Sequence, residues 1–132
     1  MLKKTITYTD YDGNERTEDF YFHFNKAELL EMELSFNGGL TKVIEKLVAE
    51  QDMKRIIEIF KDLVLKAHGE KSMDGKRFVK TAELREAFEQ TEAYSQLFME
   101  LATNADAASV FVNGIVPKEL EQPVAQQLKL ES

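Results

Sequence analysis

Acidic and amide side chains alternate at Asp10, Asp12 and Asn14, which is how the calcium-binding loop of an EF-hand begins. Such a loop also needs a glycine at its sixth position and a glutamate at its twelfth. Counted from Asp10, Gly13 stands fourth and Tyr21 stands twelfth, so the pattern fails at both positions. The Asp12-Gly13 pair is instead typical of a tight turn between two strands.

The other side chains suited to catalysis or metal binding lack partners. Glu28, Glu31 and Glu33 share one predicted helix, but no histidine lies three or four residues away to complete a metal site. His23 is expected on the surface face of a strand, and His68 in the last turn of a helix, where a cation suits the helix dipole. The chain has no cysteine, which excludes thiolate chemistry and disulfides. We therefore predict no catalytic residue, no metal site and no cofactor, and expect a protein that is not an enzyme.

The composition indicates one folded, acidic domain. The chain has 132 residues, of which 43% are hydrophobic and 31% charged, and its net charge is −7. The densest group of cations, in residues 71–80, is short and is interpreted as a solvated loop, so we expect no nucleic-acid partner. No apolar run approaches the ~20 residues of a membrane span, and the first residues lack a signal core. These features predict a cytoplasmic protein without a membrane partner.

Two strands are predicted at the start of the chain, over residues 2–9 and 16–24. Apolar residues occupy even positions in both. A three-residue turn, residues 11–13, pairs Leu2 with Phe22 and places both apolar sets on one face, whereas a two-residue turn would split them. We therefore predict the three-residue turn, with Gly13 in the left-handed conformation.

Helical periodicity follows the hairpin and predicts about five or six helices. Asn25 and Glu28 form a capping-box signal before the first of them. The apolar stripe of residues 53–67 is wide enough to predict a central, mostly covered helix. The helices are expected over residues 26–34, 40–48, 53–67, 82–90, 92–103 and 105–112.

Glycine and proline mark the expected ends of these helices. Gly69 is expected to end the helix of residues 53–67 in the left-handed conformation. Residues 70–81 are predicted as a loop that Phe78 and Val79 attach to the core. Gly114 is expected to end the last helix, and Pro117 to prevent its continuation.

Together these elements predict an α+β, mainly α fold. An N-terminal β-hairpin over residues 2–24 precedes a compact bundle of about five or six helices within residues 26–113. Residues 1–117 are expected to form a single domain, and residues 118–132 a flexible C-terminal tail.

Several apolar side chains have no obvious place in so small a core. They either pack locally against the helices or form a groove or arm that meets a partner helix. The candidate partner-binding residues are Phe36, Ile115, Val116, Leu120 and Val124.

Deleting residues 118–132 is expected to leave thermal stability nearly unchanged. A helix there would align Leu120, Val124 and Leu128, but Pro123 inside it costs about 3 kcal/mol. Ordering the backbone costs a further ~1–2 kcal/mol per residue, which favours a mobile tail in the isolated protein. Thermal unfolding of both forms tests this; a melting temperature lowered by many degrees would place the tail in the core.

Oligomers are expected at high concentration. A two-stranded hairpin is marginal alone, so it must pack on helices or pair with another chain through an open edge. Light scattering that shows only monomer well above micromolar concentration would contradict this expectation.

Several blocks of the sequence resemble the tail assembly chaperones of long-tailed bacteriophages and their prophages. The resemblance covers about residues 1–117, and residues 118–132 match no pattern of that family. The blocks that carry it are residues 4–8, 12–14, 54–63, 69–78, 93–101 and 106–108.

The resemblance implies a non-enzymatic assembly factor in the cytoplasm of an infected or lysogenic bacterium. Such proteins bind the tape-measure protein, a long, largely helical and aggregation-prone chain, and keep it soluble. They help to recruit the major tail-tube protein and are absent from the mature virion. Many are made in two lengths by ribosomal frameshifting, and this chain would be the shorter form. The alternative is a small phage or prophage regulatory protein that binds a bacterial host protein.

Overall fold

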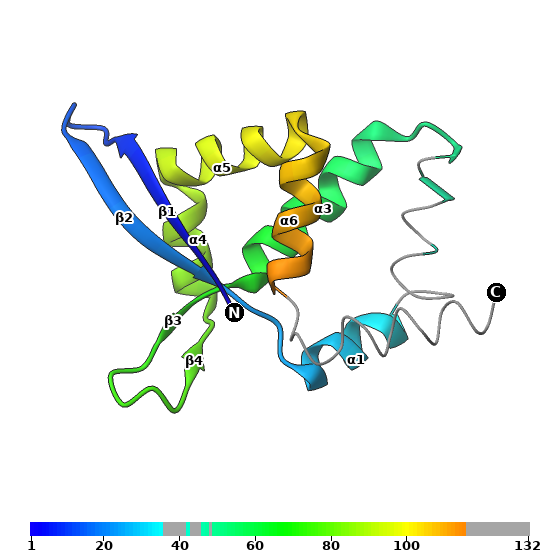
Figure 1. Ribbon diagram of the computed structural model, residues 1–132, viewed down its shortest axis with the longest axis horizontal. Helices are drawn as coiled ribbons and strands as arrows, with labels where there is room; N and C mark the ends of the chain where they lie inside the picture. Colours follow the sequence, from blue (N-terminus) through cyan, green and yellow to red (C-terminus); the bar gives the residue numbers. More distant parts are fainter. Residues whose placement is uncertain (36–41, 43–45, 48, 116–132) are drawn as a thin grey trace.

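The computed structural model of the chain describes residues 1–35, 42, 46, 47 and 49–115. The described part is α+β and mainly α, as predicted, with a four-stranded antiparallel sheet beside five helices (Figure 1). The predicted helix of residues 40–48 lies largely outside the described residues, as do residues 116–132. The strands, in sheet order, are β1 (Leu2–Thr9), β2 (Glu15–Phe22), β3 (His68–Lys71) and β4 (Phe78–Val79). The helices are α1 (Lys26–Ser35), α3 (Met53–Ala67), α4 (Ala82–Glu89), α5 (Glu92–Thr103) and α6 (Ala105–Ile115).

The register of the β1–β2 hairpin confirms the predicted turn. Leu2 pairs with Phe22 and Ile6 with Glu18, which is the pairing that a three-residue turn produces. Gly13 has φ +85°, in the left-handed region, and its N–H donates to the carbonyl of Asp10 at 3.0 Å. The apolar side chains of both strands therefore face the same side of the sheet.

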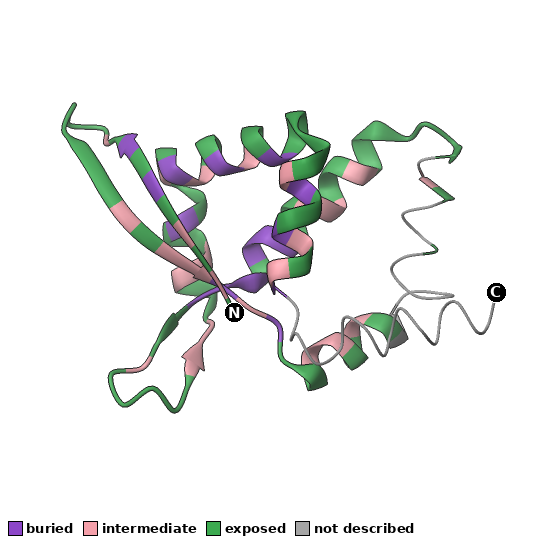
Figure 2. Ribbon diagram, viewed as in Figure 1, coloured by how far each residue is buried: buried purple, intermediate pink, exposed green. Residues whose placement is uncertain are grey.

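Aromatic rings on that face form the centre of the core. Phe22 is 0% exposed, and its ring centroid lies 5.2 Å from that of Phe111 on α6 and 5.6 Å from that of Phe88 on α4. The buried residues gather where the sheet meets α4, α5, α6 and the end of α3 (Figure 2). Such tilted ring pairs add to the stabilisation from burial of their apolar area.

Side-chain caps at the helix starts agree with the sequence signals. The Asn25 side chain accepts a hydrogen bond from the Glu28 N–H at 2.9 Å, and the Glu28 carboxylate accepts one from the Asn25 N–H at 3.0 Å. This is the reciprocal capping box that their spacing predicts. Asn104 caps α6 in a similar way, because its side chain accepts from the Ala107 N–H at 3.1 Å.

The prediction for Gly69 is wrong, because the chain passes directly from α3 into a strand. Gly69 is not among the residues with positive φ; it pairs with Tyr21 as part of β3. A Cβ at this position would lie 2.7 Å from the Val79 carbonyl oxygen and 2.8 Å from the Phe78 ring. Glycine is needed here for close approach of β4, and not for a left-handed turn.

The expected loop of residues 70–81 is largely a second hairpin. Glu70 pairs with Val79 and Lys71 with Phe78, so β3 and β4 extend the sheet beyond β2. Phe78 and Val79 are half-buried. They belong to a strand, although the sequence places them in a loop.

Helix α6 continues beyond its predicted end and includes Gly114. A Cβ on Gly114 would lie 3.0 Å from the Leu2 side chain, so glycine here permits contact between α6 and β1. The next residue, Ile115, is 2% exposed, and its carbonyl accepts a hydrogen bond from the Phe24 N–H at 2.8 Å. Tertiary contacts therefore outweigh the low helix propensity of glycine.

His68 is buried at the start of β3, and not in the last turn of a helix as expected. Its ring stacks on Phe88 with centroids 4.3 Å apart, and burial lowers its pKa, although the Tyr21 carbonyl acts in the opposite direction. His23 lies just beyond β2, where it is half-buried, and its pKa is also lowered, mainly by burial. Both histidines therefore favour the neutral form in the folded chain.

Acidification from about pH 7.5 to about pH 5.5 is expected to lower the free energy of unfolding. An unfolded histidine titrates near pH 6.5, so in this range the unfolded chain binds more protons than the folded one. His68, whose pKa is lowered mainly by burial, should contribute to this loss. Urea unfolding at both pH values measures it, with His68→Phe as the variant and His23→Gln as the control for the other histidine. A loss of the same size in His68→Phe would contradict the assignment.

Candidate functional site

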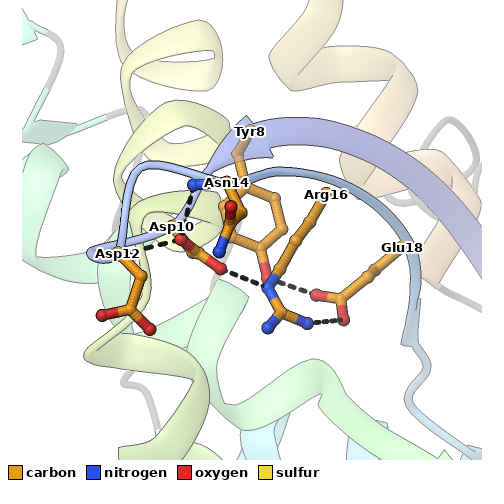
Figure 3. A network of polar contacts seen from close by, with 6 residues as sticks. All are labelled: Tyr8, Asp10, Asp12, Asn14, Arg16 and Glu18. Carbon is orange, nitrogen blue, oxygen red and sulfur yellow. Dashed lines mark hydrogen bonds and ion pairs between the residues drawn. The ribbon is translucent and has the colours of Figure 1, made fainter.

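The polar side chains at the tip of the first hairpin form a network that fixes the turn (Figure 3). One oxygen of Asp10 accepts hydrogen bonds from the N–H groups of Asp12 and Asn14, at 3.0 and 2.9 Å. The other accepts from Arg16 Nε at 2.6 Å, and this contact is the main reason that the pKa of Asp10 is lowered. Arg16 also contacts Glu18, which accepts a hydrogen bond from the Tyr8 hydroxyl.

This arrangement is structural. The Asp10 oxygens are directed at donors of the turn itself, and no group of three His, Cys, Asp or Glu side chains within the described residues is placed to hold a metal ion. The tip is also attached to the helices, because the Tyr11 hydroxyl donates to the carbonyl of Gln90 at 3.1 Å. The turn interpretation of Asp10, Asp12 and Asn14 is therefore confirmed.

Helix α3 is covered over only part of its length, which corrects the expectation of a mostly covered helix. Its buried residues are confined to the C-terminal third, Leu63 to Ala67. Towards the N-terminus the apolar stripe continues, but Met53 is 59% exposed and Ile57 is 40% exposed. Periodicity identified the stripe correctly, but it does not reveal which parts of the stripe a neighbour covers.

An open cavity of about 520 Å³ lies beside this stripe, and we call it the helix groove. It is formed by α3, the end of α5 and α6. None of its lining side chains is charged, in a chain with 31% charged residues. Its lining includes Phe60, Leu101, Ala105, Ala108, Ser109 and Val112.

The helix groove has the properties of a surface that receives another helix. Alanine and serine on α6 leave room for a close approach, while Phe60 and Val112 offer half-buried apolar surface. An amphipathic helix laid into such a groove buries its apolar face and leaves its polar face in water. Val110, which is exposed on the same helix, adds apolar surface to α6 outside the groove.

Of the residues proposed from the sequence as partner-binding, Ile115 lies within the described residues, and it does not line this groove. Ile115 packs in the core, where it is 2% exposed. Phe36, Val116, Leu120 and Val124 lie outside the described residues. The one sequence signal for the groove is the wide apolar stripe on residues 53–67. Only part of this stripe is buried against the core.

The chain matches a protein-family model described as phage tail assembly chaperone, over residues 1–131. The chain belongs to this family. The match continues beyond residue 117, so the expectation that residues 118–132 depart from the family pattern is wrong. No curated protein and no solved structure matches the chain.

Membership places the chain among bacteriophage tail assembly proteins and indicates that its partners are phage tail proteins. Within the described residues, no helix combines the length and apolar character that crossing a membrane requires. The helix groove is therefore the leading candidate for the binding surface of this tail assembly chaperone.

Proposed function

We propose that the chain binds the tape-measure protein, keeps it soluble and assists assembly of the tail tube. The proposal also places it in the cytoplasm of the bacterial host and outside the mature virion. The observation that supports it most is the uncharged helix groove in a member of the tail assembly chaperone family. The chain acts by binding, so no catalytic group is needed.

The physical task is to cover apolar helix surface that would otherwise aggregate. A partner helix that enters the groove can contact Phe60, Ala108 and Val112 with its apolar side. The chaperone adds its net charge of −7 to the complex, which opposes further association. A single groove of this size buries modest area, and such interfaces bind reversibly, as release during assembly requires.

Co-expression with the cognate tape-measure protein is expected to increase the soluble fraction of that protein. Ser109→Lys places a long cation in the groove and should remove most of the increase, because charge is costly to bury against an apolar helix face. Ser95→Lys is the matched control, since Ser95 is also an exposed helical serine but does not line the groove. The fraction is measured by centrifugation and quantitative gel analysis.

The outcomes separate the function from its site. If wild-type chain leaves the solubility of several tape-measure fragments unchanged, the chaperone proposal fails. If Ser109→Lys acts like wild type, the function stands but the groove is not its site. A pull-down with purified major tail-tube protein tests the second partner, and no retention would restrict the role to the tape measure.

A further inference from the structure

Residues 116–132 lie outside the described residues, and they continue from the end of α6. Helix α6 ends at Ile115, and Asn113 just before it lines the helix groove. Pro117 cannot continue the helix, and it disfavours helical backbone at the residue before it. The chain is therefore expected to leave the axis of α6 close to one end of the helix groove. We call residues 118–132 the C-terminal segment.

The helix groove and the C-terminal segment match in length. On α6 the lining extends from Ala105 to Asn113, which is about 12 Å at the helical rise of ~1.5 Å per residue. A helix can begin at Pro123, because the first turn of a helix accepts proline. Val124 and Leu128 would then lie on one face, about 6 Å apart along the axis, so both fit within the groove.

The two surfaces also match in chemistry. Residues 122–128 contain no charged side chain, in a chain with 31% charged residues, and the lining of the groove contains none either. Ala108 and Ser109 leave space in the wall that α6 provides, and Val124 and Leu128 are aliphatic side chains that can fill it. No charge has to be buried when the two come together, so the contact avoids the main cost of desolvation.

The short connection between α6 and the C-terminal segment favours contact within one molecule. Segments joined by a short linker have an effective concentration of about a millimolar. A contact with a dissociation constant of about one millimolar is too weak to join separate molecules at micromolar concentration, but within one chain it is formed about half of the time. Such a contact adds little to stability, in agreement with the small effect expected when residues 118–132 are deleted.

We propose that residues 120–128 fold back into the helix groove of their own chain and compete there with the partner helix. The competition rests on the proposed function, because it requires that the tape-measure helix uses the same groove. The contact of the segment with the groove does not depend on any partner. The segment covers the groove until a helix that binds more tightly displaces it, so the groove selects against weakly bound chains.

An intramolecular disulfide tests the contact, since the natural chain has no cysteine. In Ser109→Cys/Val124→Cys, mild oxidation should close the disulfide at least tenfold faster than in Val110→Cys/Val124→Cys. Val110 is the matched control, because it is the next residue of α6 and 67% exposed but does not line the groove. Adding Leu120→Ser/Leu128→Ser to the first pair should slow closure to the rate of the control. Mass spectrometry after alkylation of the remaining thiols gives the rates.

Two outcomes of the cross-linking would overturn the proposal. Equal rates in the two cysteine pairs would show that the segment has no preference for the groove. Disulfides that form mainly between chains would show that the groove receives the segment of a second copy instead. Circular dichroism confirms that each variant is folded, and neither measurement involves the tape-measure protein.

The competition is tested by the affinity for a tape-measure fragment, measured by isothermal titration calorimetry. Deleting residues 118–132 should tighten binding about two- to tenfold, because the partner no longer displaces the segment. Leu120→Ser/Val124→Ser/Leu128→Ser should tighten it to the same extent. Unchanged or weaker binding by the deletion variant would overturn the competition. A full-length chain that binds no fragment would contradict the proposed function, whereas the rates of disulfide closure would still decide whether the segment occupies the groove.

Discussion

Phe22→Ala is expected to lower the free energy of unfolding by about 3–5 kcal/mol, the range for removing a fully buried phenylalanine ring. Phe22 is 0% exposed and contacts rings from three other elements: His68 on β3, Phe88 on α4 and Phe111 on α6. Removing it leaves a cavity at the point where the sheet and the helices meet. A loss of this size is a large share of the stability of an ordinary domain.

Urea unfolding followed by circular dichroism measures the change. Phe98→Ala is the matched control, because the ring of Phe98 is half-buried and stacks on Tyr94 at the surface of α5. The control should lose clearly less stability. Equal losses in the two variants would show that the centre of the core does not lie at Phe22.

Gly69→Val is expected to destabilise the fold by about 1–3 kcal/mol, the usual cost of forcing extra atoms into a packed site. Valine favours strands in general, so propensity alone predicts the opposite sign. The deciding fact is the backbone oxygen of Val79, 2.7 Å from where the Cβ would lie. A backbone atom in a paired strand cannot move aside as a flexible side chain can.

Glu70→Val is the control for this substitution. Glu70 is the next residue of β3 and is exposed, so its change should stay within about 0.5 kcal/mol of wild type. Chemical unfolding of the two variants gives the comparison. If Gly69→Val is as stable as Glu70→Val, β4 does not approach β3 as closely as described.

The first hairpin and most helix starts were predictable from the sequence. The register of the hairpin follows from the even positions of the apolar residues in both strands. Of the two turn lengths considered, only the three-residue turn brings Leu2, Phe20 and Phe22 to the same face. The helix caps also depend on residues that are close in the sequence. The side chains of Asn25 and Glu28 each accept a hydrogen bond from the backbone N–H of the other. Both features depend on residues that are close in the sequence or related by a simple alternation.

The features that the sequence did not reveal depend on distant partners. The segment His68–Lys71 has no β-branched residue, and it forms a strand because β2 and β4 lie on its two sides. Gly114 ends a helix in isolation, but here α6 continues because Leu2 fills the space that a side chain would occupy. The helix groove combines residues from three helices, and no spacing within one helix indicates it.

The contact of Gly114 with Leu2, together with the hydrogen bond from Phe24 to Ile115, has a consequence for biosynthesis. Strand β1, the first of the described strands to be translated, packs against α6, the last of the described helices, so the described fold has contacts between its two ends. Until α6 has been translated, Phe22 lacks the ring of Phe111 that covers it. We expect the nascent chain to expose this phenylalanine-containing strand until α6 is available to cover it. This protein is thus most prone to aggregation while it is being synthesised.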